Sequence, residues 1–447
     1  MKRVLIANRG EIALRIIRAL REYGYFSVLA YSEADRDSLP VKLSDAAICI
    51  GPASARGSYL NIPAIISAVE ITGCDAVHPG YGFLAESPQF ARVCMDAGII
   101  FIGPSPEAME KVGDKSVARA VAKSAGVPVV PGSNGFVSSK DELFKLAKEI
   151  SFPLILKAAA GGGGKGMRIV QSFSELENSF DTASNEAKTA FGNSKLYLEK
   201  YVSEPRHIEI QFARDKFGNC VSLFERECSI QRKHQKLLEE SPSSFVSPKL
   251  RKELSEAALA IANQVDYVGI GTAEFLVTQE EKFYFIEINA RIQVEHPVTE
   301  MVTGIDLVEL QLIIAEGKPI PFSQDDVKIT GHAIECRINA EDPRNNFCPS
   351  PGKVTQFIPP CGPGIRCDSH LYSGFEIVPY YDSLIAKVIS YAPNRERAIN
   401  RMQRALYEMT VEGISTTIDF HMEVLKNAFF RKGDYYTNFV QRRMGIK

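Results

Sequence analysis

The chain has 447 residues, enough for about three domains, with 32 glycines, 24 prolines and 45% hydrophobic residues. Lysine and arginine (52) nearly balance aspartate and glutamate (54), which leaves a net charge of -2. This composition excludes collagen-like and low-complexity chains, and it offers no general electrostatic attraction to DNA or RNA, so no nucleic-acid partner is expected.

No run of 18 apolar residues occurs, so no membrane-spanning helix is predicted. The first apolar stretch, VLIA (4–7), is too short for a signal peptide. The nine cysteines are scattered and form no CxxC pair, which excludes zinc-ribbon and thioredoxin-type sites. Reduced thiols and a cytoplasmic location are therefore expected.

The first hundred residues alternate between strand and helix patterns. Strands are predicted at 4–7, 26–32, 75–82 and 98–105, and apolar residues at helical spacing predict a helix over 11–23. Such alternation predicts βαβ units and a parallel sheet of Rossmann-like type.

The turn after the first strand reads NRGEIALR, with Gly10 as its one glycine. The G-x-G-x-x-G fingerprint is absent, so binding of NAD or FAD is disfavoured.

The segment 160–167, AGGGGKGM, lies between two predicted strands. Glycines let backbone amides approach phosphate oxygens, and a lysine adds positive charge, so the loop is a candidate phosphate-binding site. It is not a P-loop, because Met167 and Arg168 lead into a strand in place of a helix. A flexible hairpin tip is the alternative interpretation.

Further along, RHIEIQFARDKFGNCVSLFERECS (206–229) predicts an antiparallel hairpin with a turn at 215–219. GTAEFLV (271–277) and the segment from 282 onward predict a second hairpin, joined by TQEE.

In this second hairpin Glu274 can lie opposite Glu287, and Asn289, Arg291 and Gln293 share the parity of Glu287. Two carboxylates and an amide suit a magnesium ion with phosphates. The alternative is an exposed polar sheet face, but the flanking apolar residues indicate burial. Unpaired buried carboxylates would be costly, so a cation is the better explanation.

The run RKHQK (232–236) has two interpretations. It is a solvated basic face, or its alternating His234 and Lys236 point into one anion site. No G-x-S-x-G elbow occurs and no cysteine nucleophile is indicated, so phosphate and magnesium chemistry is favoured over acyl-enzyme chemistry.

Eight stretches in order along nearly the whole chain resemble the biotin carboxylase subunit of acetyl-CoA carboxylase, a member of the ATP-grasp superfamily. They are IANRGEIALRIIRA (6–19), HPGYGFLAE (78–86), KAAAGGGGKGMRIV (157–170), YVSEPRHIEIQ (201–211), RECSIQRKHQKLLEESPS (226–243), FIEINARIQVEHPVTE (285–300), GHAIECRINAEDP (331–343) and PYYDSLIAKVI (379–389).

The resemblance implies an α/β (α+β) fold in three parts. The first is an N-terminal domain over 1–114 with a Rossmann-like parallel sheet. An ATP-grasp domain over 115–330 follows, with a mobile lid at about 131–203. The last is a mixed α+β C-terminal domain over 331–447.

The resemblance also implies site residues. Those for ATP are Lys115, Lys157, Gly163, Gly164, Glu199, Lys200, Tyr201, Val202, His207, His234, Glu274 and Glu287, with the stretch 199–202 acting mostly through its backbone. Two magnesium (or manganese) ions would be held by Glu274, Glu287 and Asn289. Bicarbonate would contact Lys236, Arg291, Gln293 and the backbone of Val294. Glu295 would be the general base and Arg337 would bind biotin, so that Arg291, Glu295, Lys236 and Arg337 form the catalytic group.

The implied activity is ATP-dependent carboxylation of biotin by bicarbonate, through carboxyphosphate. This is the first half-reaction of acetyl-CoA carboxylase, which supplies malonyl-CoA for fatty acid synthesis. No Met-Lys-Met tripeptide occurs, so biotin is expected on a separate carrier protein, with carboxyltransferase subunits as further partners and a homodimer as the assembly.

Three alternatives stay open. The chain could serve another acyl-CoA or pyruvate carboxylase. It could be another ATP-grasp ligase, such as half of a carbamoyl-phosphate synthetase, which should lack Arg337 in its ECRINAEDP context. A non-catalytic nucleotide sensor should lack Glu295 or Arg291, and both are present.

Overall fold

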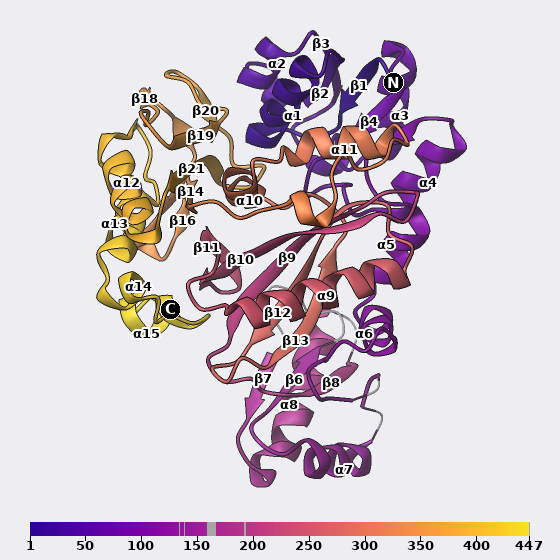
Figure 1. The fold of residues 1–447 in the computed structure, drawn as a ribbon, viewed down its shortest axis with the longest axis vertical. Coiled ribbons are helices and arrows are strands. Elements are labelled where there is room, and N and C mark those ends of the chain that lie inside the picture. The colour runs from indigo at the N-terminus through magenta and orange to yellow at the C-terminus, as the bar shows by residue number, and fades with distance from the viewer. Residues whose placement is uncertain (134, 138, 159–166, 192–193, 447) are drawn as a thin grey trace.

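The computed structural model describes residues 1–133, 135–137, 139–158, 167–191 and 194–446. In Figure 1 the N-terminal part lies at the top right and the C-terminal helices at the left. The strands β6, β7 and β8 and their helices lie at the bottom.

The N-terminal part is a five-stranded parallel sheet in the order β3-β2-β1-β4-β5. This confirms the predicted Rossmann-like alternation. The strands are β1 (Arg3–Ile6), β2 (Phe26–Ser32), β3 (Ala46–Gly51), β4 (Ala76–His78) and β5 (Ile100–Phe101). The helices are α1 (Gly10–Glu22), α2 (Leu39–Leu43), α3 (Ile62–Thr72), α4 (Pro88–Asp96) and α5 (Pro106–Gly113), and α6 (Lys115–Ser124) follows.

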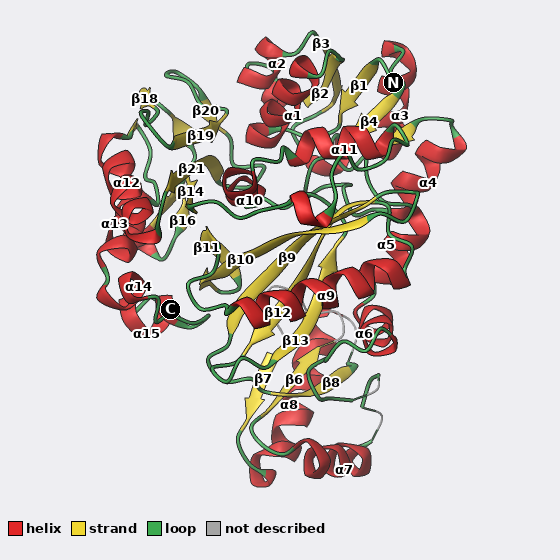
Figure 2. Cartoon of the chain, viewed as in Figure 1, coloured by secondary structure: helices red, strands yellow, loops and turns green. Residues whose placement is uncertain are grey.

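An eight-stranded antiparallel sheet forms the centre of the molecule, in the order β13-β12-β9-β10-β11-β14-β21-β19. Its strands are β9 (Arg206–Arg214), β10 (Cys220–Arg232), β11 (Gln235–Ser241), β12 (Gly269–Val277), β13 (Phe283–Asn289), β14 (His332–Asn339), β19 (Ile365–Ser369) and β21 (Leu384–Ala392). Helix α9 (Pro248–Gln264) packs against β9 and β10 (Figure 2). Two shorter helices, α10 (His296–Thr303) and α11 (Leu307–Ala315), follow β13.

The central sheet runs across the expected boundary near residue 330. Strand β11 pairs with β14 through partners such as Leu238 and Cys336. Side chains from both segments can therefore meet on one rigid face, while the division into three domains stays a prediction.

A separate three-stranded antiparallel sheet, β7-β6-β8, lies in the region expected to form the lid. Its elements are β6 (Leu154–Ala158), β7 (Met167–Val170), β8 (Leu196–Lys200), α7 (Lys140–Ile150) and α8 (Phe173–Phe191). Leu143, Leu154, Leu176 and Leu198 form a small core of its own, which lets this unit keep its structure apart from the central sheet.

The C-terminal part adds helices and short strands to the far end of the sheet. One of these helices is α12 (Arg395–Glu408). The remaining elements are β15 (Glu341–Asp342), β16 (Cys348–Pro349), β17 (Gly352–Lys353), β18 (Gln356–Ile358), β20 (Glu376–Ile377), β22 (Thr410–Glu412), α13 (Ile418–Lys426), α14 (Ala428–Lys432) and α15 (Phe439–Met444).

Both predicted hairpins are confirmed, because β9 pairs with β10 and β12 with β13. A third hairpin, β10–β11, was not predicted. Its two-residue turn consists of Lys233 and His234, whose φ angles are 49° and 65°. Such a turn usually contains Gly, Asn or Asp, and their absence hid it.

Among the described residues no helix has both the length and the apolar character needed to cross a membrane. All nine cysteines are free.

Candidate active site

A cavity of about 1320 Å³ opens where the central sheet, the small sheet and the N-terminal loops meet. Nearly all predicted site residues within the described part of the chain line it, namely Lys115, Lys157, Glu199, Lys200, Tyr201, Val202, His207, His234, Lys236, Glu274, Glu287, Asn289, Arg291, Gln293, Val294 and Arg337. Gly163 and Gly164 lie outside the described residues. Glu295 is fully buried behind the wall of the cavity.

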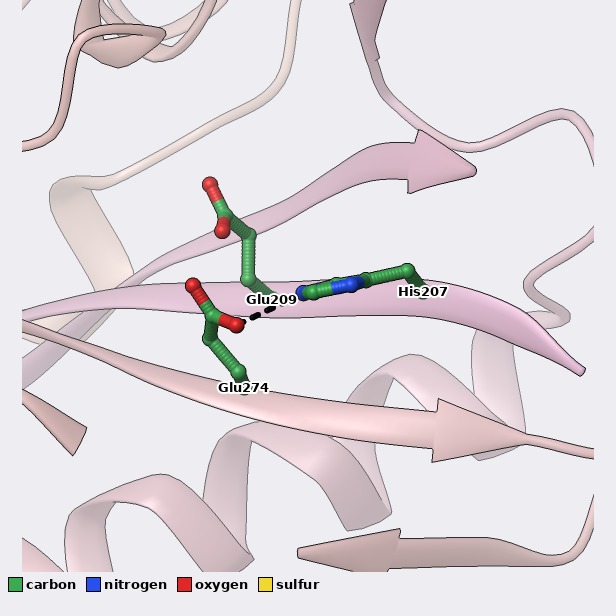
Figure 3. Close-up of side chains that lie close together, drawn as sticks. All are labelled: His207, Glu209 and Glu274. Carbon is green, nitrogen blue, oxygen red and sulfur yellow. Dashed lines mark ion pairs between the residues drawn. The ribbon is translucent and has the colours of Figure 1, made fainter. Parts of the chain in front are cut away.

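The hairpin β12–β13 places Glu274 directly opposite Glu287, as predicted. Glu274 Oε2 lies 2.8 Å from Nε2 of His207, on the neighbouring strand β9. Asn289 Nδ2 donates to Glu274 Oε1 at 2.8 Å. Figure 3 shows the side chains of His207, Glu209 and Glu274 converging from two adjacent strands.

Lys236 on β11 is the shared cation of three carboxylates. Its Nζ lies 2.5 Å from Glu209, 2.8 Å from Glu274 and 2.7 Å from Glu295. Burial alone would lower the pKa of Lys236, but these three anions raise it well above its ordinary value. The ammonium is therefore fixed in its charged form.

Glu295 lies between Lys236 and Arg337, and Arg337 Nη2 donates to its Oε2 at 2.8 Å. Burial would raise the pKa of Glu295, but the charges of Lys236, Arg337 and Arg226 outweigh it and hold that pKa well below its ordinary value. Glu295 is thus an ionised carboxylate at neutral pH, held between two cations.

Arg337 on β14 is oriented by a second carboxylate, because its Nε donates to Glu239 Oε1 at 2.6 Å. Its Nη1 has no hydrogen bond to any described residue. Since Arg337 lines the cavity, one edge of the guanidinium remains available to a bound molecule.

The parity pattern that groups Glu287 with Arg291 and Gln293 holds only to Asn289, where β13 ends. Beyond the strand, loop contacts bring the side chains together. Arg291 Nε donates to Glu86 at 3.0 Å, and Arg291 Nη1 donates to Gln293 Oε1 at 2.8 Å.

Elsewhere in the cavity lining, Lys157 Nζ donates to Glu199 Oε2 at 2.5 Å, and Arg119 Nη1 donates to Glu199 Oε1 at 2.6 Å. Lys200 points away, because its Nζ donates to the carbonyls of Ser151 and Phe152. Its side chain is therefore engaged elsewhere, as expected if this segment acts through its backbone. His234 is exposed at the hairpin tip and is one of the residues that line the cavity.

The carboxylate pair fits a hard divalent cation. Glu274 is already surrounded by positive or donor groups, whereas the nearest described cation to Glu287 is Lys115, at 3.6 Å. Burial and the neighbouring charge of Glu274 raise the pKa of Glu287, so a metal ion would relieve a repulsion that is present between the two strands.

Several charged residues of this face were not predicted. Arg226 is fully buried and donates to Glu209, Gln211, Thr299 and Thr272. Glu239 and Glu335 lie opposite one another on β11 and β14. The available signal was the presence of charged residues beside apolar residues within one strand, as in LFERE (223–227) and LLEE (237–240).

The fold and the site define a class. An antiparallel sheet with a carboxylate pair, a cavity that contains lysines and a small sheet beside it are the features of ATP-grasp enzymes. Residues 114–323 match the family "Carbamoyl-phosphate synthase L chain, ATP binding domain". Residues 1–109 and 335–442 match the N-terminal and C-terminal domains of biotin carboxylase.

The chain belongs to the biotin carboxylase family, a group of ATP-dependent ligases. It is 52% identical to biotin carboxylase 1 of Bacillus subtilis over 442 residues, which cover 99% of this chain and 98% of that protein. It is 51% identical to the biotin carboxylase of Haemophilus influenzae, with 100% and 99% coverage.

Solved structures support membership of the same family. The complex "Biotin Carboxylase-beta-gamma-ATP" from Campylobacter jejuni is 51% identical, with a TM-score of 0.94 and coverage of 99% and 98%. The biotin carboxylase domain dimer of the Hydrogenobacter thermophilus 2-oxoglutarate carboxylase, in complex with MgADP, ADP and bicarbonate, is 46% identical, with a TM-score of 0.93 and coverage of 100% and 98%.

Glu335 supplies a prediction on stability. It is fully buried, and neither carboxyl oxygen has a partner among the described residues. Burial raises its pKa well above the ordinary 4.5, and the charge of Glu239 acts in the same direction. The folded protein therefore keeps a proton that the unfolded chain releases above about pH 4.5, so this contribution to stability is lost as pH rises.

At pH 5, the free energy of unfolding of Glu335→Gln should match that of the wild type within about 1 kcal/mol. At pH 8, the variant should be more stable than the wild type, as measured by urea unfolding. The control is Glu240→Gln. Glu240 is also fully buried, but it is ionised and paired with Arg395 and His332, so about 3 kcal/mol should be lost at both pH values. An equal loss in Glu335→Gln at pH 5 would mean that Glu335 is ionised.

Proposed function

We propose that this chain carboxylates biotin on a separate carrier protein, with ATP, magnesium and bicarbonate, through carboxyphosphate. The observation that carries the proposal is Glu295, an ionised carboxylate held between Lys236 and Arg337 beside a cavity that also contains the Glu274–Glu287 pair. A general base, two anion-binding cations and a metal-binding pair are the groups that this reaction requires.

In this proposal ATP phosphates are bound by Lys115, Lys157, His207 and the amides of Gly163 and Gly164, with His234 nearby, and the adenine by the segment 199–202. Glu274, Glu287 and Asn289 would hold two magnesium or manganese ions, which would supply charge compensation to the phosphates. Bicarbonate lies against Lys236, Arg291, Gln293 and the backbone of Val294. Apart from Gly163 and Gly164, which lie outside the described residues, these positions line one cavity.

The low pKa of Glu295 bears directly on its role as a base. A carboxylate paired with two cations is a weak proton acceptor. When bicarbonate binds Lys236 and biotin binds Arg337, each cation shares its charge with a substrate. The pKa of Glu295 then rises, so Glu295 becomes able to take the proton of bicarbonate as bicarbonate attacks the γ-phosphate.

Carboxyphosphate then gives carbon dioxide and phosphate, and the phosphate removes the proton from the biotin ring nitrogen. Arg337, which lines the cavity, stabilises the negative charge that develops on the ureido oxygen. Glu239 and Glu295 hold this guanidinium in place before the substrate arrives.

The partners proposed are a biotin carboxyl carrier protein, carboxyltransferase subunits and a second copy of the chain. A dimer is supported by the Hydrogenobacter relative, which is a domain dimer. Acetyl-CoA is proposed as the final acceptor, with malonyl-CoA as the product. Relatives from 2-oxoglutarate and pyruvate carboxylases keep other acceptors open. A cytoplasmic location rests on the scattered cysteines in the sequence.

The function is tested by ADP formation. Purified chain with ATP and magnesium should form ADP slowly when bicarbonate is added, and faster when biotinylated carrier is also present. Label from bicarbonate should appear on the carrier. Bicarbonate-independent ATP cleavage, or label on another acceptor, would favour a different ATP-grasp ligase.

Glu287→Gln should lose most turnover, roughly a hundredfold, because the amide is a poor ligand for a divalent cation. The fold should persist, since Glu287 has few partners to lose; circular dichroism and urea unfolding check this. Excess magnesium or manganese should restore part of the rate. A variant with a near-normal rate at ordinary magnesium would contradict the metal assignment.

The variants Arg337→Ala and Glu295→Ala should differ in their bicarbonate-dependent ATP cleavage. Arg337→Ala should keep slow bicarbonate-dependent ATP cleavage but lose its stimulation by biotin, because carboxyphosphate still forms. Glu295→Ala should lose both, since the base is absent. Each loss should be about 3 kcal/mol in activation free energy. The same pattern in both variants would show that the two roles are not separate.

A further inference from the structure

Lys387 is a lysine with 0% of its surface exposed, in the middle of strand β21. It faces Arg337 on one neighbouring strand and Asp368 on the other. A buried ammonium is costly unless specific partners compensate its charge, so its contacts reveal what it does.

Those contacts join three distant segments. Lys387 Nζ donates to the backbone carbonyl of Val294 at 3.0 Å and lies 3.1 Å from Glu11 Oε1. Glu11 is buried in the first turn of α1 and also accepts a hydrogen bond from the hydroxyl of Tyr81, which lines the cavity. The ammonium of Lys387, on β21, therefore connects the N-terminal part with the loop after β13.

The loop after β13 lies outside any strand, so side chains must fix its path. Glu86 accepts from the backbone N–H of Ala290, and the ring Nδ1 of His296 lies 2.7 Å from the Gln293 carbonyl. Lys387 adds a charged donor to the next carbonyl, that of Val294. This carbonyl belongs to the peptide that links Val294 to Glu295.

We infer that Lys387 is a positioning residue for bicarbonate, whose buried ammonium fixes the Val294–Glu295 peptide against the N-terminal helix. The inference rests on the proposed function, which places bicarbonate at Val294 and the base at Glu295. Lys387 is not among the described residues that line the cavity. It therefore acts through this peptide and does not contact the substrate.

A purely structural role would have a different signature. A buried ion pair can often be replaced by neutral groups without loss of stability, provided that no lone charge remains. If Lys387 only balances the charge of Glu11, neutralising both residues should restore both the stability of the fold and the binding of bicarbonate. If Lys387 orients the peptide, neutralising both should restore folding but not bicarbonate binding.

The experiment compares Lys387→Met with the double variant Glu11→Gln/Lys387→Met. In bicarbonate-dependent ATP cleavage, Lys387→Met should raise the KM for bicarbonate at least roughly tenfold and leave the KM for ATP nearly unchanged. The double variant should recover the urea unfolding midpoint and keep the raised KM for bicarbonate. If Lys387→Met does not fold, the double variant alone carries the test.

Arg395→Met is the matched control. Arg395 also pairs with a buried glutamate, Glu240, through a 2.7 Å contact. It is not among the described residues that line the cavity. It should lower the unfolding midpoint and leave the KM for bicarbonate as in the wild type.

A normal KM for bicarbonate in Lys387→Met or in the double variant would overturn the inference, and so would equal rises in the KM values for ATP and bicarbonate. Absence of bicarbonate-dependent ATP cleavage in the unmodified chain would instead overturn the proposed function, and this inference with it.

Discussion

The site depends on the pairing of charges on one face of the central sheet. Lys236 contacts three carboxylates, and Glu295 is held by two cations. None of these groups is stable alone at this depth, because an unpaired buried charge costs several kcal/mol. Each charge therefore constrains the positions of the others. The arrangement is set before any substrate binds, which is the condition for electrostatic stabilisation of a transition state.

The continuous sheet is what makes this pairing possible. Glu209, Lys236 and Arg337 come from β9, β11 and β14, and neighbouring strands keep a fixed spacing of about 4.8 Å. Long side chains at facing positions then meet without the adjustment that loops would allow. The exception is the loop after β13, which carries Arg291 and Glu295. This loop depends on Glu86, His296 and Lys387 for its path. It is therefore the part of the site most sensitive to mutations elsewhere in the chain.

The sequence predicted those features that local pattern determines. The alternation of the first hundred residues and the TQEE turn were sufficient for the parallel sheet and for the Glu274–Glu287 pair. The sequence did not predict Arg226, Glu239 or Lys387, because charged residues within a strand normally indicate a solvated face. Here that face is covered, and the partners lie up to several hundred residues away, as Glu11 does from Lys387. The β10–β11 turn was missed because Lys233 and His234 are not turn-forming residues.

The same physics explains why the acyl acceptor leaves so little trace in this chain. On the proposed chemistry the cavity contacts ATP, bicarbonate and the ureido ring, and none of these changes with the acid that is finally carboxylated. The buried charges that recognise them cannot vary without leaving a partner unpaired. The biotin carboxylase domain of a 2-oxoglutarate carboxylase shares 46% identity with this chain over nearly its whole length, and the biotin carboxylase subunit of a pyruvate carboxylase shares 47%. On the proposed function, specificity for the acceptor therefore resides outside this cavity, where the carrier would deliver its carboxylated biotin.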